Sequence, residues 1–331
     1  MVWRPSGFRP NRLACPGPTR PAGASSINEG VRDMNLRKNS PAGPIVAGAA
    51  ALVLVLAATF TMRASAGEVV PISNLAKQTH IHGLAVDPLD GTRLLIATHH
   101  GVFSAGPDGK AERISAVQDF MGFSPHPRDP RLLYASGHPA QGGNLGFVAS
   151  SDQGSTWTQI SPGANGPVDF HQLTISPADP NTLYGAFRGL QLSRDGGRTW
   201  TVTAPEPERL IDLAASAKSP DTLYAATEAG LFLSKDAGKT WRSILEGAPV
   251  SLVEVTPAGT IYAFVIGRGL VRGAEDDLTF ATVSEASRTP PLMHLAVDPN
   301  NPDRLFAAAG RGQMLKSDDR GRTWTAFHTG L

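Results

Sequence analysis

Nine histidines occur in this sequence of 331 residues, and all of them lie between residues 80 and 328. Most fall at two positions of an internal repeat described below: the start of the first predicted strand of a repeat, and the turn that leaves its second strand. In an antiparallel sheet these two positions lie at the same end. We therefore expect nine side chains to meet there, namely His80, His82, His99, His100, Asp119, Met121, His138, Asp169 and His171.

This group of side chains has the chemistry of a transition-metal site. Imidazole, thioether and carboxylate are ligands for copper, zinc and nickel, and a methionine sulfur with several imidazoles favours copper, with zinc or nickel as alternatives. Neutral histidine is also a general base or proton shuttle, and it can bond to backbone and water alone. The leading interpretation is a site for a small ligand or a metal ion. The predicted metal ligands are His80, His82, His99, His100, Met121, His138 and His171, with Asp119 and Asp169 positioning them.

A hydrolase is the first alternative, and whether the chain is catalytic stays open from its residues. A two-carboxylate glycosidase needs an Asp or Glu pair roughly 5–10 Å apart beside a sugar cleft. The candidate catalytic carboxylates at the same end of the repeats are Asp119, Asp169 and Glu228, with Asp212 and Glu254 as weaker candidates. Two histidines outside the two positions, His126 and His328, are interpreted as surface or turn residues.

Four copies of the pattern Ser-x-Asp-x-Gly-x-Thr-Trp define the repeat. They span residues 150–157, 193–200, 234–241 and 317–324, and their tryptophans lie 43, 41 and 83 residues apart, which gives a period of about 41. Repeats of this length are typical of propeller blades or helical arrays. Here short apolar runs alternate with Pro, Gly and Asp turns, without helical periodicity. Each repeat therefore predicts a blade of four strands.

Two further, degenerate repeats bring the number to six. They are recognised by Leu95-Ile96 and Ile261-Tyr262 at the second-strand position, and the six repeats begin near residues 80, 119, 169, 209, 249 and 291. The predicted fold is all-β, a six-bladed β-propeller of four-stranded antiparallel blades with Asp-box turns. Residues 69–73 resemble a fourth-strand segment, so we expect them to complete or extend the last blade and help close the ring.

The four boxes resemble the Asp-box (BNR) repeats of sialidases, sortilin-like ectodomains and photosystem II assembly-factor propellers, over residues 69 to the end. The resemblance implies that the box residues are structural. In it the Asp accepts turn amides, the Gly permits positive φ and the Trp packs between blades. These residues are Asp152, Trp157, Asp195, Trp200, Asp236, Trp241, Asp319 and Trp324.

The same resemblance offers two functions besides ligand binding. Exported bacterial proteins of this type are catalogued as glycosyl hydrolases, but a sialidase mechanism wants a tyrosine nucleophile. The four tyrosines, Tyr134, Tyr184, Tyr224 and Tyr262, all occupy one second-strand position and are predicted to be core residues, so a sialidase mechanism is disfavoured. The other function is a protein-binding platform, for which the insertion at 139–146 offers a loop beside His138.

The first 66 residues have a different character from the rest. Residues 34–66 combine a basic start, an apolar stretch at 45–62 and Ala64-Ser65-Ala66, the form of a cleaved signal peptide, with a membrane anchor as the alternative. Residues 1–33 are interpreted as an over-extended, disordered N-terminus, and residues 67–331 as the propeller. We therefore predict a periplasmic or secreted bacterial protein.

Charge and cysteine content limit the kinds of partner that we expect. Residues 1–66 hold eight of the 30 Lys and Arg, two of the 29 Asp and Glu, and the single cysteine, Cys15, which leaves a net charge of about −5 for residues 67–331. A mildly acidic domain without a basic run is not expected to bind nucleic acid. The expected partners are a small ligand, a glycan or a metal ion, with an exported protein as a further possibility, and we expect a monomer.

Overall fold

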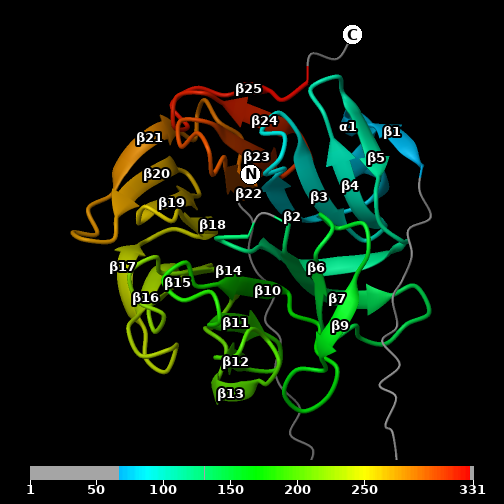
Figure 1. Ribbon diagram of the computed structural model, residues 1–331. Helices are drawn as coiled ribbons and strands as arrows, with labels where there is room; N and C mark the ends of the chain where they lie inside the picture. Colours follow the sequence, from blue (N-terminus) through cyan, green and yellow to red (C-terminus); the bar gives the residue numbers. More distant parts are fainter. Residues whose placement is uncertain (1–66, 130, 329–331) are drawn as a thin grey trace, which may run out of the picture. The chain divides into compact units, whose positions relative to one another are not determined.

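A computed structural model describes residues 67–129 and 131–328 of the chain, and within them six antiparallel sheets form a ring (Figure 1). The inner strand of each sheet contacts the inner strands of both neighbouring sheets, and β2 contacts β22, so the ring is closed. The predicted all-β, six-bladed propeller is confirmed. The first strand of each blade begins close to the repeat start that the sequence predicted.

The first three blades are built from these elements: β1 (Val69–Pro71), α1 (Ile72–Gln78), β2 (Ile81–Val86), β3 (Leu94–Thr98), β4 (Gly101–Ala105) and β5 (Lys110–Arg113); β6 (Gln118–Pro125), β7 (Leu133–Pro139), β8 (Phe147–Ser150) and β9 (Thr158–Ser161); β10 (Gln172–Ile175), β11 (Leu183–Ala186), β12 (Leu190–Ser193) and β13 (Thr201–Ala204). The last three are β14 (Leu210–Ala215), β15 (Leu223–Thr227), β16 (Gly230–Ser234) and β17 (Arg242–Glu246); β18 (Val250–Val255), β19 (Thr260–Val265), β20 (Gly269–Ala274) and β21 (Ala281–Glu285); β22 (Leu292–Val297), β23 (Leu305–Ala309), β24 (Met314–Ser317) and β25 (Thr325–Ala326).

The hydrophobic core lies between the blades. The second strands β3, β15 and β23 are buried along their whole length, because both of their faces pack against a neighbouring sheet. The four tyrosines lie in this core and are at most 9% exposed, so their predicted packing role is confirmed. No tyrosine of the described residues is left for a sialidase-like nucleophile.

The Asp boxes form the turns between the third and fourth strands. In the first box Asp152 Oδ1 accepts the amide of Thr156 at 2.8 Å and the hydroxyl of Ser150 at 2.8 Å. The same contacts recur at Asp195, Asp236 and Asp319. These turns lie at the end of the blades opposite the predicted site, because successive strands run in opposite directions. The box aspartates therefore hold these turns through backbone and hydroxyl contacts.

Packing between blades explains the box glycine and tryptophan. Trp200 lies with its ring centroid 4.8 Å from that of Phe170 in its own blade and 5.3 Å from that of Phe147 in the preceding blade. Gly197 has a φ of +82°, and a Cβ there would lie 2.0 Å from the Phe147 ring. A side chain at this position would collide with the neighbouring blade, so glycine is required by packing as well as by conformation.

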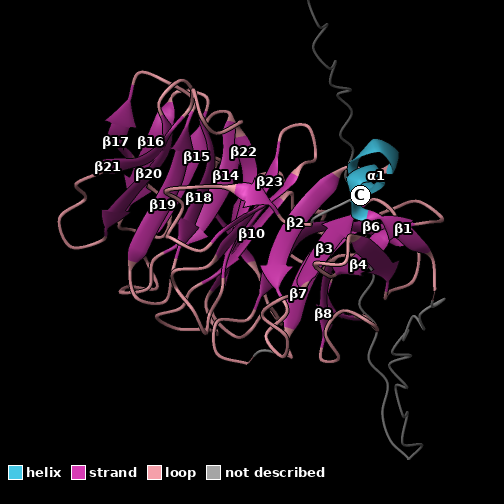
Figure 2. Ribbon diagram, turned by 90° about the horizontal axis from the view of Figure 1, so that it is seen from above, coloured by secondary structure: helices cyan, strands magenta, loops and turns pink. Residues whose placement is uncertain are grey.

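The N-terminal strand does not complete the last blade, and that prediction is wrong. Val69 to Pro71 pair with Lys110 to Glu112, which makes β1 a fifth strand of the first blade. The last repeat supplies its own fourth strand, β25, so its sheet has no missing strand. The link to the last blade is made instead by α1, whose Ile72 and Leu75 pack in one cluster with residues of that blade, among them Phe306, Met314 and Phe327. Figure 2 shows α1 beside β1.

Side chains hold the inner edges of the blades together. An inner strand has no partner strand on its channel side, and five of the six seams join it to the next blade through a hydrogen bond between a side chain and the backbone. These bonds are Ser124 to Leu173 (2.5 Å), Gln172 to Ile211 (2.6 Å), Asp212 to Val253 (2.9 Å), Ser251 to Leu292 (2.6 Å) and His294 to Ile81 (3.0 Å). Among the described residues the seam between blades one and two has no such bond.

Residues 1–66 lie outside the described part of the chain, and with them the predicted signal peptide, the extended N-terminus and Cys15. Within the described part, no helix has the length and apolar character needed to cross a membrane.

Candidate functional site at the channel mouth

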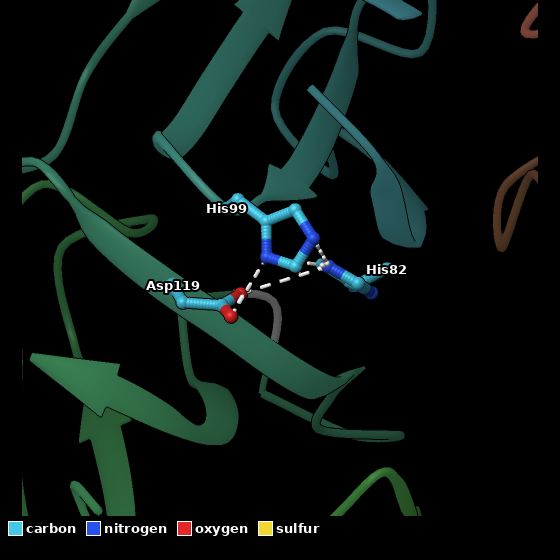
Figure 3. A group of neighbouring side chains, drawn as sticks. All are labelled: His82, His99 and Asp119. Carbon is cyan, nitrogen blue, oxygen red and sulfur yellow. Dashed lines mark hydrogen bonds and ion pairs between the residues drawn. The ribbon is translucent and has the colours of Figure 1, made fainter. Parts of the chain in front are cut away.

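Three of the predicted side chains meet at the seam between the first two blades (Figure 3). His82 is on β2, His99 follows β3 and Asp119 is on β6. His82 Nε2 lies 3.2 Å from His99 Nδ1 and 3.6 Å from Asp119 Oδ1, and His99 Nδ1 lies 2.8 Å from Asp119 Oδ2. We call these three residues the seam cluster.

A β-bulge sets the direction of His82. The pairing of β2 with β3 shifts register between Ile81 and Gly83, so His82 has no partner opposite it. The same shift occurs at the equivalent residues Ile211, Ser251 and Met293 of other blades. Bulges re-aim side chains, and here the bulge accompanies an imidazole that faces the neighbouring blade.

Burial controls the protonation of His82. Desolvation lowers the pKa of His82 to about 4, against the opposing charge of Asp119 and with smaller contributions from His99, His294 and His80. The His82 imidazole is therefore neutral near pH 7. Asp119 Oδ1 is buried and lacks a hydrogen bond. His80 is exposed, with its ring centroid 5.2 Å from that of His99.

A second group lies at the seam between blades two and three. The Nε2 atoms of His138 and His171 each lie 3.0 Å from Asp169 Oδ2, and the Asp169 side chain is 5% exposed. Burial by itself raises the pKa of Asp169, but the hydrogen bond from His171 and the charges of both histidines lower it overall. The bond to Asp169 in turn raises the pKa of His171, although burial opposes this. We call these three residues the Asp169 cluster.

The two clusters belong to one mouth. His138 is the residue directly opposite Asp119 in the pairing of β6 with β7, and its ring reaches Asp169. Directly opposed residues have Cα atoms about 4.5–5.5 Å apart. The charge of Asp119 also contributes to raising the pKa of His171. Asp119 and Asp169 thus lie on adjoining blades, and His138, the partner of Asp119 across β6 and β7, contacts Asp169.

Several predicted residues lie apart from these clusters. His100 is exposed, and its backbone amide donates to Thr98 Oγ1. Met121 is half-buried on β6 and pairs with Ser136. Glu228 forms an ion pair with Arg209 on blade four, away from Asp119 and Asp169 in the chain's ring order.

Three polar residues of the inner strands have pKa values shifted by burial, which the sequence alone did not indicate. Burial raises the pKa of Asp212 to about 7, and burial with the nearby charge of Asp212 raises that of Glu254 to about 8. Burial lowers the pKa of His294, which bonds to the backbone of Ile81. The signal for all three is a polar residue inside an apolar strand, as in Leu-Ile-Asp-Leu-Ala-Ala at 210–215.

A shallow open groove on blade three adjoins the Asp169 cluster. Its lining includes Arg188, Gly189, Val202 and Glu206, and its volume is about 590 Å³. Glu206 accepts the amide of Gly189 at 3.0 Å, and its charge also raises the pKa of His171. The groove therefore offers a cation, a carboxylate and apolar surface next to that histidine.

Comparisons with known proteins find partial sequence similarity to two xyloglucanases and a similar fold in solved structures. No family model matches the sequence. It is 32% identical over 135 residues to a probable oligoxyloglucan-reducing end-specific xyloglucanase of Neosartorya fischeri, a match that covers 36% of this chain and 17% of the relative. It is 28% identical over 141 residues to the corresponding enzyme of Emericella nidulans, covering 38% of this chain and 17% of the relative.

A solved structure has a similar fold. The GH74 enzyme of Niastella koreensis superposes with a TM-score of 0.53 at 16% identity, over 75% of this chain and 45% of that one. At this identity the likeness concerns the fold. The chain spans about a sixth of the length of the curated relatives it matches.

Proposed function

We propose that this protein is an exported glycoside hydrolase that holds a glycan across the channel mouth. The observation that carries the proposal is the similarity to two xyloglucanases, together with a pair of carboxylates at the mouth of a β-propeller. The sequence alone favoured ligand or metal binding, with a hydrolase and a protein-binding platform as alternatives. The similarity to the xyloglucanases favours the hydrolase.

The Asp169 cluster supplies the acid and base chemistry. Glycoside hydrolysis uses one group that protonates the leaving oxygen and one ionised carboxylate that activates water or stabilises the positive sugar ring. The lowered pKa of Asp169 keeps it ionised, and the raised pKa of His171 keeps a proton on its imidazole further toward neutral pH. His171 is then the proton donor, and Asp169 the carboxylate that holds it and balances developing charge.

Asp119 supplies the second carboxylate. It lies on the adjoining blade, and its partner across β6 and β7, His138, contacts Asp169. The proposal requires the two carboxylates to act about 5–10 Å apart, the separation of paired glycosidase carboxylates. A sugar bound between them would expose one face of its ring to each carboxylate.

The groove on blade three extends the site. A polysaccharide is long and bears many hydroxyls, so it is suited to an open, polar groove better than to an enclosed pocket. Arg188 and Glu206 there offer hydrogen bonds, and Val202, which is 44% exposed, offers apolar contact to a sugar face. Export of the chain would bring this groove to extracellular or periplasmic glycans.

A substrate panel tests the proposal. Full-length protein is incubated with xyloglucan oligosaccharides, other β-glucans, α-glucans and sialylated glycans, and released sugars are identified by mass spectrometry. We expect cleavage of a neutral β-glucan and none of the sialylated glycans. If folded protein neither binds nor cleaves any glycan of the panel, the proposal is wrong.

A further inference from the structure

The seam between blades one and two is joined in a different way from the other five. At those seams a side chain from an inner strand bonds to the backbone of the next blade. At this seam the described residues place two imidazoles and a carboxylate against one another instead. Three side chains that converge from three segments of two blades form a site rather than a simple inter-blade bond.

The separations within the seam cluster match those between the ligands of one metal ion. Zinc binds histidine nitrogen and carboxylate oxygen at about 2.0–2.2 Å, which places the ligand atoms of a tetrahedron about 3.3 Å apart. The two imidazole nitrogens lie 3.2 Å apart, and the carboxylate lies 3.6 Å from His82 Nε2 through Oδ1 and 2.8 Å from His99 Nδ1 through Oδ2. One ligand atom from each residue can be chosen so that all three lie within 4.8 Å of one another. One ion fits between these atoms with small side-chain adjustments.

The surroundings also favour a bound cation. Asp119 Oδ1 is buried and has no hydrogen-bond partner, although a buried carboxylate oxygen without one is costly. His82 Nε2 lies 3.2 Å from one ring nitrogen of His99 and 3.3 Å from the other, whereas an ordinary hydrogen bond would favour one of them. A metal ion would give the free oxygen a partner and replace this ambiguous contact.

We propose that His82, His99 and Asp119 bind one divalent transition-metal ion of the zinc type, with a further coordination position open at the channel mouth. Two histidines and a carboxylate with an open position form a ligand set known for zinc. The site differs from the one expected from the sequence: it uses two of the predicted ligands together with Asp119, which was expected to position them, and it has no sulfur ligand to favour copper. It shares Asp119 with the proposed hydrolase site, but zinc binding and glycan cleavage are measured separately.

Metal binding is measured directly on the full chain. Metal-stripped protein is titrated with Zn²⁺ by calorimetry, and the loaded protein is dialysed and analysed for metal content. Co²⁺ is then substituted, since a low-symmetry nitrogen and oxygen site changes its visible absorption. The variants are His99→Ala, Asp119→Asn and the matched control His100→Ala, which removes the neighbouring exposed imidazole.

We expect one Zn²⁺ per wild-type chain and the same affinity for Zn²⁺ in His100→Ala. In His99→Ala and Asp119→Asn the affinity for Zn²⁺ should fall about 100-fold or more, because loss of a ligand costs at least as much as loss of its supporting contacts. Circular dichroism establishes that each variant is folded. Absence of Zn²⁺ and Co²⁺ binding by folded wild type would overturn the proposal. Equal affinity in wild type and both ligand variants would overturn it as well. Neither readout requires glycan cleavage, so this test and the substrate panel fail separately.

Discussion

Replacing Trp200 with alanine tests the claim that the Asp-box tryptophans hold adjacent blades together. Trp200 is 8% exposed and packs between Phe147 of one blade and Phe170 of the next. Its indole N–H donates to Gly197 O at 2.9 Å and to Ser161 Oγ at 3.0 Å. Its removal would therefore open a cavity at the blade seam.

The expected cost is about 3–5 kcal/mol of unfolding free energy, the usual range for a buried Trp replaced by Ala. The lost hydrogen bonds add little, because the Ser161 hydroxyl still donates to Gly197 O at 2.6 Å. Trp324→Ala is the matched control. Trp324 occupies the same box position, but it is only half-buried and its indole nitrogen has no hydrogen bond.

Urea unfolding followed by far-ultraviolet circular dichroism measures both variants, since this signal does not depend on the deleted indole. We expect Trp324→Ala to cost less than Trp200→Ala by at least about 1 kcal/mol. Equal costs, or a cost below about 1 kcal/mol for Trp200→Ala, would refute the inter-blade role.

Three further predictions follow from single contacts. Gly197→Ala should cost about 1–3 kcal/mol in urea unfolding, because its Cβ meets the Phe147 ring and its φ is +82°; no loss would contradict the required close approach. Asp169→Asn should lower thermal stability most between about pH 4 and 6.5, where the carboxylate with the lowered pKa is ionised and His171, whose pKa is raised, is protonated. A loss independent of pH would argue against that ion pair. Wild-type stability should fall between about pH 4.5 and 8, because there the folded state keeps a proton on Glu254 that the unfolded state has released; Glu254→Gln should remove the part of this fall above about pH 7, where Asp212 has also lost its proton, and an unchanged profile would contradict the neutral carboxyl.

The repeat made most of the fold predictable. Each box repeats the same local turn chemistry, so its strands, turns and tryptophan positions could be placed from residue types alone. The position of residues 69–73 could not, because the first and last blades offer similar sheet edges and the choice depends on β25 completing the last blade.

The sequence predicted at which end of the blades the candidate site lies, but not which of its side chains contact one another. Strand direction places the nine residues at one end of the blades, and six of them form the two clusters described above. The sequence does not show which of His99 and His100 faces Asp119, since both lie in one turn. Nor does it show the bulge at His82, because a bulge depends on pairing with another strand.

The most direct test of the central claim compares wild-type protein with Asp169→Asn on the glycan that the panel selects. We predict that the variant folds and still binds the glycan but that kcat/KM falls about 100-fold or more, because it loses the carboxylate that holds the proton donor His171 and balances the developing charge. The matched control is Asp108→Asn, an exposed turn aspartate at the opposite end of the first blade, which should cleave the glycan at the wild-type rate. Full activity in Asp169→Asn would contradict the account.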